Sequence, residues 1–169
     1  QAIRIYALSQ LAKYVPGNVF HLAGRQALGV AAGFSGKALM KALFGELALI
    51  SLVALYFVFF TLPALSVNVS FTQALALFGV SFCLTLLLVG RFMNARVVRA
   101  FLLQFIFLGV SGYIFIRCLG LLGTEVVSDD FFVTLGAYVV AWLVGLVTPG
   151  APAGLGVREA VLLFFLGGR

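Results

Sequence analysis

Residues 42–62 read ALFGELALISLVALYFVFFTL, a run of 21 residues in which Glu46 is the one charged side chain. A helix needs about 20 mostly apolar residues to cross the hydrocarbon core of a bilayer. The run has that length, and Pro63 follows it as a residue that breaks helices. We therefore predict a membrane-spanning helix over residues 42–62.

The rest of the chain has the same apolar character. Of its 169 residues, 63% are apolar and 9% are charged, whereas soluble domains carry about 25% charged residues. This composition excludes a water-soluble domain. Three further apolar runs, 71–90, 100–122 and 131–148, predict three more spans. We expect residues 1–169 to form one all-α integral membrane domain, a polytopic bundle of transmembrane helices.

The polar residues between the spans indicate where helices begin and which way they point. Ser70 and Gln73 have the spacing of a capping box at the start of the second span. Loop 91–99 carries three arginines and two lysines precede the first span, whereas residues 63–70 and 123–130 contain neither. The positive-inside rule places loop 91–99 on the cytoplasmic side of the membrane. The net charge of +6 is thus explained by basic residues on the cytoplasmic side of the membrane, and it does not indicate a nucleic-acid partner.

Two similar Pro-Gly motifs flank the four predicted spans, one in residues 1–36 and the other in residues 149–169. YVPGNVFHLAGRQAL and VTPGAPAGLGVREAV align without a gap, and three of the identical pairs are Pro16 with Pro149, Gly17 with Gly150, and Arg25 with Arg158. Gly/Pro-interrupted segments at corresponding places in two halves are typical of a transporter binding site. We interpret them as broken, re-entrant segments of an internal repeat, parallel because four spans separate them.

Physical chemistry gives such segments two alternative roles. Backbone freed by proline and glycine must be buried in protein or line a wet cavity. A helix that restarts there directs its first N–H groups into the cavity, and an adjacent arginine completes a site for a phosphate. Alternatively, each motif is an interfacial turn whose arginine meets acidic headgroups, worth about 1 kcal/mol. The sequence leaves both open.

The segments KYVPGNVFHLAGR and TPGAPAGLGVREA resemble the membrane region of the lysylphosphatidylglycerol synthase family and its uncharacterised inner-membrane relatives. The resemblance covers residues 8–166. It implies a membrane domain that moves an aminoacylated phospholipid to the outer leaflet, or that works beside a glycosyltransferase or lipid synthase. GAPAG departs from the usual Pro-Gly-Gly, and no aminoacyl-transfer domain is present in the sequence. The residues that the resemblance assigns to the site are Pro16, Gly17, Arg25, Glu46, Pro149, Gly150, Gly154, Gly156, Arg158 and Glu159.

The remaining ionisable residues do not predict an enzyme. His21 is the one histidine, too few ligands for a metal site, and we expect it to contact packing residues or a headgroup. Asp129 and Asp130 fit a helix N-cap better than a catalytic pair. Glu46 and Glu159 could each neutralise an arginine or carry a proton. We predict no catalytic residues, no metal and no cofactor.

The sequence therefore predicts a flippase-like membrane protein that binds and translocates an anionic phospholipid or isoprenoid-linked precursor. The alternative is a non-transporting partner that presents such a lipid to an enzyme, and catalysis by the acidic residues ranks third. A transporter should bring Arg25 and Arg158 to one cavity, whereas a presenting protein can leave them apart. The last run, AVLLFFLGGR, is too short to cross a bilayer, so we expect the chain to be part of a longer protein.

Overall fold

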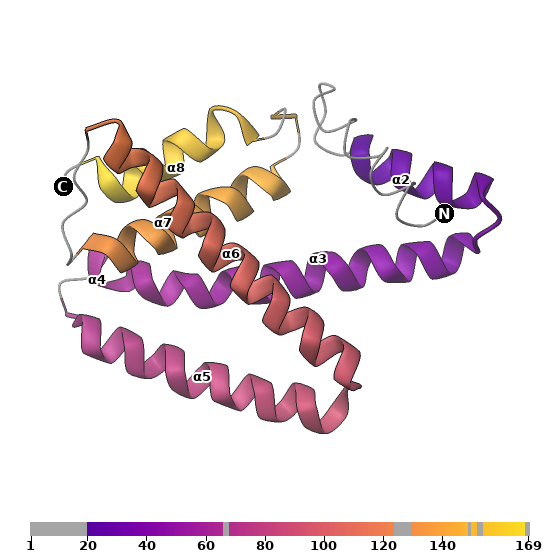
Figure 1. The fold of residues 1–169 in the computed structure, drawn as a ribbon, viewed down its shortest axis with the longest axis horizontal. Coiled ribbons are helices and arrows are strands. Elements are labelled where there is room, and N and C mark those ends of the chain that lie inside the picture. The colour runs from indigo at the N-terminus through magenta and orange to yellow at the C-terminus, as the bar shows by residue number, and fades with distance from the viewer. Residues whose placement is uncertain (1–19, 66–67, 124–129, 149, 152–153, 168–169) are drawn as a thin grey trace.

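The computed structural model describes residues 20–65, 68–123, 130–148, 150–151 and 154–167, and it is helical throughout (Figure 1). No strand occurs in these residues, which confirms the all-α class. The elements are α2 (Phe20–Ala31), α3 (Gly36–Val58), the 3-10 turn η2 (Phe59–Thr61), α4 (Leu62–Leu65), α5 (Phe71–Phe92), α6 (Ala95–Leu121), α7 (Phe131–Val147) and α8 (Val157–Leu166).

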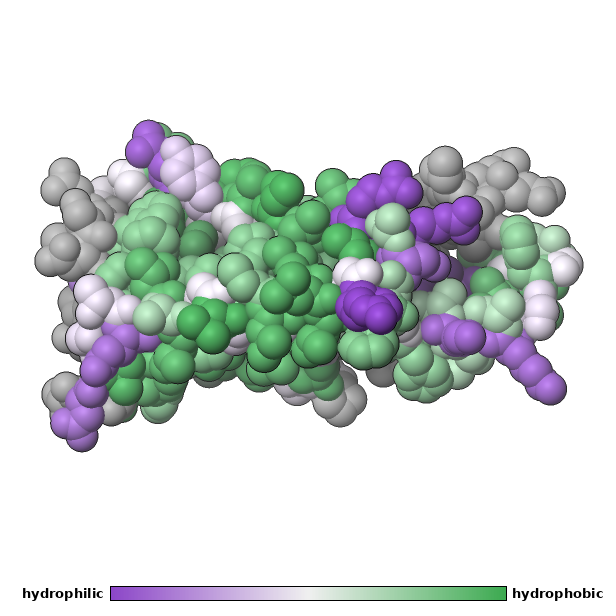
Figure 2. All heavy atoms as spheres, turned by 90° about the horizontal axis from the view of Figure 1, so that it is seen from below, coloured by the Kyte–Doolittle hydropathy of each residue, from purple (hydrophilic) through white to green (hydrophobic). Residues whose placement is uncertain are grey.

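Within the described residues, three helical segments are long and apolar enough to cross a membrane, which indicates a membrane protein. They are Gly36–Leu65, Phe71–Phe92 and Ala95–Leu121. Figure 2 shows apolar residues over the middle of the molecule, with hydrophilic residues gathered toward its two ends. The apolar helix α7 has 17 residues, about 25 Å at 1.5 Å per residue, slightly less than a hydrocarbon core of about 30 Å. The fourth span, 131–148, therefore stays a prediction.

The first predicted span is corrected at both ends. Its helix begins at Gly36 rather than at residue 42, and the chain stays helical to Leu65 instead of stopping before Pro63. Pro63 lies in the first turn of α4, where a missing N–H is tolerated. In a regular α-helix its ring would meet the carbonyl of Phe59, and η2 begins at that residue. The tighter turn thus lets the helical segment continue past the proline.

Helix caps explain the starts of α5 and α6. The predicted capping box is confirmed: Gln73 N–H donates to Ser70 Oγ at 3.3 Å, and Ser70 N–H donates to Gln73 Oε1 at 3.0 Å. The third predicted span starts at Ala95 rather than at residue 100. Asn94 caps this helix by accepting bonds from the N–H groups of Arg96 and Val97. Polar capping residues extend α6 beyond its apolar run.

Helix α7 lies at the centre of the packing and contacts α3, η2, α6 and α8. Glycines permit its close contacts, since a Cβ on Gly136 would lie 2.6 Å from the backbone oxygen of Phe57. On α6, a Cβ on Gly112 would lie 2.8 Å from Leu135 Cδ1. Small residues at crossings are how membrane helices approach closely without a hydrophobic force between them. Gly136 and Gly112 therefore allow α7 to approach α3 and α6 closely.

Aromatic side chains fill the space between α3, α5 and α6. The Tyr56 hydroxyl donates to the Ser81 carbonyl at 3.3 Å and shares a hydrogen bond with the Thr85 hydroxyl. These bonds join α3 to α5 inside an apolar environment, where a polar contact between helices is worth about 0.6 kcal/mol on average. Around Tyr56, rings within 5.5–6.2 Å of its centroid come from Phe78, Phe82 and Phe101.

The order of the helices fixes the directions of the two motif helices. The chain reverses at residues 32–35, where Gly33 has a φ of 87°, so α2 and α3 are antiparallel neighbours (Figure 1). α8 is antiparallel to α7, which in turn is antiparallel to α3. α2 and α8 consequently run in opposite directions, contrary to the predicted parallel repeat. The prediction counts only the four spans. The turn at Gly33 reverses the chain once more, between α2 and α3, and this inverts α2 relative to α8.

The basic residues of the two predicted cytoplasmic segments lie toward the same end of the molecule. α3 begins, and α5 passes into α6, toward the end that carries α2 (Figure 1). We call this the basic end and define it by Lys37, Lys41, Arg91, Arg96 and Arg99, all of which are exposed. The arrangement agrees with the predicted pairing of these segments, and its cytoplasmic side stays a prediction.

Candidate functional site: the α7–α8 hairpin

The second Pro-Gly motif forms the turn between α7 and α8 and depends on glycine. Gly150, Gly154 and Gly156 have φ values of 88°, 77° and 81°, in the left-handed region that glycine adopts without strain. Gly156 is the N-cap residue of α8. These glycines thus adopt a backbone conformation that other residues rarely adopt, while Pro149 lies outside the described residues.

Arg158 leaves the first turn of α8 and crosses α7 at Gly145. A Cβ on Gly145 would lie 2.7 Å from Arg158 Cγ and 2.8 Å from its Nε. A Cβ on Gly154 would lie 2.8 Å from the same Nε and 2.9 Å from Gly145 Cα. Two glycines, one from the helix and one from the turn, thus form a slot for the arginine side chain. We call these two residues the glycine slot.

The Nε atom of Arg158 is buried in this slot, and among the described residues it has no hydrogen-bond partner. A buried donor without an acceptor costs about 1–3 kcal/mol. The side chain as a whole is only partly buried, so its exposed surface belongs to other atoms. Arg158 is therefore a charged side chain whose hydrogen-bonding capacity is incompletely used.

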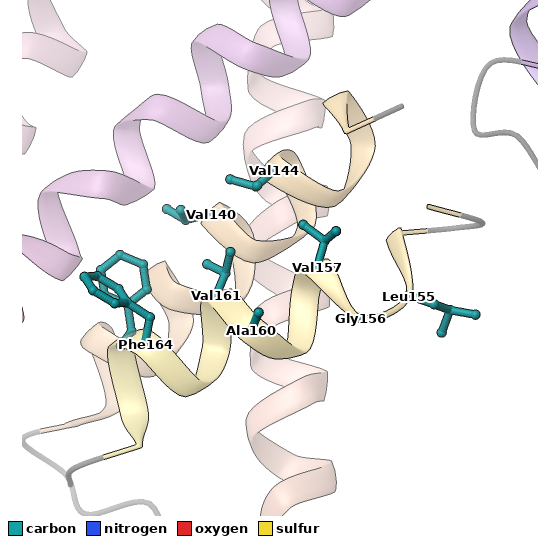
Figure 3. Close-up of a pocket in the computed structure, with 9 residues that line it drawn as sticks. Val140, Val144, Leu155, Gly156, Val157, Ala160, Val161 and Phe164 are labelled. Carbon is teal, nitrogen blue, oxygen red and sulfur yellow. The ribbon is translucent and has the colours of Figure 1, made fainter. Parts of the chain in front are cut away.

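An open apolar groove of about 660 Å³ runs beside Arg158, between α7 and α8. Figure 3 shows Val157 and Val161 of α8 directed toward Val140 and Val144 of α7, with Phe164 at the far end. Gly156 lines the groove at the N-terminal end of α8. Val157, which lines the groove, directly precedes Arg158 in sequence. Arg158 is not among the lining residues, but it adjoins them through Val157 on α8 and through its contact with Gly145, which follows Val144 on α7.

The chemistry of this arrangement suits an amphiphile. The volume lies within the range of about 300–1,000 Å³ that is typical of ligand pockets, and valine, alanine and phenylalanine side chains line most of it. An arginine and the amide groups of a helix N-terminus both attract anions, and guanidinium binds phosphate through paired hydrogen bonds. An apolar chain in the groove would place an attached anionic group near Arg158.

The part of the first Pro-Gly motif that the structure describes begins at Phe20, in α2, and there the arginine has a different environment. Arg25 of α2 forms an ion pair with Glu46 of α3, with Arg25 Nη2 at 2.7 Å from Glu46 Oε2. The side chain of Arg25 is 16% exposed and that of Glu46 is 41% exposed. α2 approaches α3 closely at Gly29, where a Cβ would lie 2.7 Å from Leu39 Cδ1. Two residues that the resemblance assigned to the site are thus joined here.

The other predicted site residues are spread over the molecule. Glu159 is exposed in the first turn of α8, where a negative charge suits the helix dipole. In the part of the chain that the structure describes, it forms no ion pair with Arg158. His21 belongs to α2, but its side chain is not among the described ones. Pro16, Gly17 and Asp129 lie outside the described residues, and Asp130 is the N-cap residue of α7.

Arg25 and Arg158 do not converge in the described structure. Arg25 belongs to the α2–α3 pair and Arg158 to the α7–α8 pair, and the two pairs lie apart along the long axis (Figure 1). The shared cavity expected for a transporter is therefore not formed by these two side chains. The cause is local, since each arginine packs against the helix that is its own hairpin neighbour.

Sequence reasoning missed Gly145, which holds the crossing of Arg158 over α7. The segment WLVGLV is compatible with any apolar helix. The one sequence feature that could have indicated a close contact at Gly145 is a small residue inside a predicted span. Among the described residues, no group of three or more His, Cys, Asp or Glu side chains is placed to hold a metal ion.

No family model, no curated protein and no solved structure matches the chain.

Proposed function

We propose that the chain is a bacterial inner-membrane protein that binds an anionic phospholipid or isoprenoid-linked precursor at the α7–α8 hairpin and moves it between leaflets. The observation that carries the proposal is the apolar groove beside Arg158, whose Nε lacks an acceptor in the described residues. The resemblance of both Pro-Gly motifs to the lysylphosphatidylglycerol synthase membrane region favours the same class of ligand.

The physical argument starts from the cost of charge in hydrocarbon. Ionisable residues at membrane depth are costly, so they pair with other groups or mark substrate paths. A lipid phosphate would offset the charge of the Arg158 guanidinium, whose hydrogen-bonding capacity is incompletely used within the protein, and the lipid chain would cover the valines of the groove. One ligand would thus satisfy both the polar and the apolar part of the hairpin.

Translocation in proteoliposomes tests the proposal. Fluorescent phosphatidylglycerol would be incorporated in both leaflets, and an impermeant quencher would report how fast inner-leaflet probe becomes accessible. We expect the wild type to accelerate quenching and Arg158→Ala to abolish most of that acceleration. Arg117→Ala is the matched control, because Arg117 is exposed late in α6 and its loss changes the charge equally.

A second candidate is a non-transporting protein that presents a lipid-linked substrate to a glycosyltransferase or lipid synthase. It is favoured by one observation, the placement of Arg25 and Arg158 in separate helix pairs. In that case the wild type would bind fluorescent phosphatidylglycerol or an isoprenoid phosphate in an Arg158-dependent way without accelerating quenching. Absence of both binding and translocation, with folding intact, would reject both functions.

A further inference from the structure

The glycine slot is specific to the crossing between Arg158 and α7. Gly150 and Gly156 belong to the same turn, yet a Cβ on either would meet no described heavy atom within 4 Å. A Cβ on Gly145 would instead meet Arg158 Cγ, Arg158 Nε and Gly154 Cα, at 2.7, 2.8 and 3.3 Å. Of the two glycines of α7, Gly136 packs against α3 and η2, and Gly145 is the one over which the arginine passes.

Glycine at position 145 is unfavourable for the helix itself. In a helix interior glycine is about 1 kcal/mol less favourable than alanine, and Gly145 lies inside α7 and is buried. Thr148 closes this end of α7 by donating through its hydroxyl to the Val144 carbonyl at 2.7 Å. Gly145 lies inside the α-helix and is not among the described glycines with a positive φ, so local backbone geometry does not require glycine there.

The contact at Cγ decides what a methyl group at position 145 would do. Cγ is the second carbon of the arginine side chain, so a clash there cannot be relieved by moving only the guanidinium. The whole stem must rotate away from α7, which carries the charge to another place. A methyl group on α7 would therefore relocate the cation without altering any charge.

We propose that Gly145 is a positioning residue that holds the Arg158 side chain in place for an anionic lipid headgroup at the α7–α8 groove. This inference rests on the proposed lipid-binding function. According to this inference, Gly145, an apolar residue of α7, controls charge selectivity. Charge selectivity here means the preference for an anionic lipid over a zwitterionic lipid with the same chains.

The test compares the binding of fluorescent phosphatidylglycerol and fluorescent phosphatidylcholine, with identical chains, to the purified full chain in detergent micelles. We expect wild type to prefer phosphatidylglycerol, and Gly145→Ala to lose about tenfold of that preference, as expected when a charge-assisted contact is lost. Arg158→Ala should lose as much of the preference for phosphatidylglycerol. The double variant should lose no more than either single variant, because both substitutions remove the same interaction. Gly79→Ala is the control, since a Cβ there meets no described atom within 4 Å.

Folding gives a second measurement that does not require lipid. If Gly145→Ala lowers the melting temperature, the Arg158→Ala background should restore much of the loss, because the clashing Cγ and Nε are gone. If Gly145→Ala lowers the melting temperature equally in the wild-type and Arg158→Ala backgrounds, the clash is with Gly154 and not with the arginine. That result would overturn the inference.

The outcomes separate the inference from the function on which it rests. A wild-type preference for phosphatidylglycerol that Arg158→Ala removes and Gly145→Ala leaves intact overturns the inference alone. A wild type without any such preference overturns anionic-lipid recognition itself, and the inference with it.

Discussion

The α2–α3 and α7–α8 pairs place similar motifs in contrasting environments. In the first pair, Arg25 meets a carboxylate, Glu46, on the helix that follows its own. In the second, Arg158 lies in the glycine slot, between Gly145 of the preceding helix and Gly154 of the turn, and its Nε has no acceptor among the described residues. Each motif thus supplies an arginine, while the neighbouring helix decides whether the charge is neutralised within the protein.

The largest expected effect is within the α7–α8 pair, at Gly154. Gly154→Ala should lower the free energy of unfolding by roughly 3 kcal/mol, from overpacking and from the cost of a left-handed conformation. Gly156 has a similar φ of 81°, and a Cβ there would meet open space in the described structure. Gly156→Ala should therefore lose only the part of the stability that comes from the cost of the left-handed conformation. Thermal unfolding in detergent micelles, followed by circular dichroism, measures both. Equal losses would show that the close contact with Gly145 contributes nothing.

A substitution of the same kind should have opposite effects on the two arginines. Without lipid, Arg158→Met should raise the free energy of unfolding by about 1 kcal/mol, because it removes a buried donor that lacks an acceptor. Arg25→Met should lower it by up to about 1 kcal/mol, because it removes a partly exposed ion pair. Unfolding of both variants in lipid-free micelles tests this. A loss of stability in both would mean that Arg158 is satisfied in its slot.

Glycine to alanine changes inside the helices should also separate the pairs. Gly24 lies inside α2, and a Cβ there meets no described atom within 4 Å. Gly24→Ala should therefore raise the free energy of unfolding by about 0.5–1 kcal/mol through helix propensity. Gly145→Ala should raise the helix propensity of α7 by the same amount. It should still destabilise the protein, because the new methyl group would clash with Arg158. If thermal unfolding shows that both variants stabilise it, the slot is looser than the distances indicate.

The smallest expected effect is at Glu46. Glu46→Gln removes the charge of a side chain that is 41% exposed, so we expect a loss of less than about 0.5 kcal/mol. The difference from wild type should vanish in about 1 M salt, where the Debye length is about 3 Å. A loss that persists at that salt concentration would identify a buried interaction in place of a screened surface pair.

The sequence predicts the helical runs well because crossing a bilayer demands long apolar stretches. It predicts their ends less well, since Asn94 caps α6 from outside the apolar run and the chain stays helical past Pro63. Of the site, the left-handed glycines follow from the motif. The Arg25–Glu46 pair depends on the reversal at Gly33, and Gly145 is indistinguishable by composition from other glycines in apolar helices. Both require the helix packing to be known.

The central place of α7 has a consequence for biosynthesis. Chains are made from the N-terminus, and domains generally fold in that order during synthesis. α3, α5 and α6 would therefore leave the ribosome before the helix that contacts two of them through Gly136 and Gly112. Until α7 arrives, those contact surfaces would face lipid or a membrane chaperone. Completion of the bundle would thus be a late event, coupled to the arrival of the hairpin that carries Arg158.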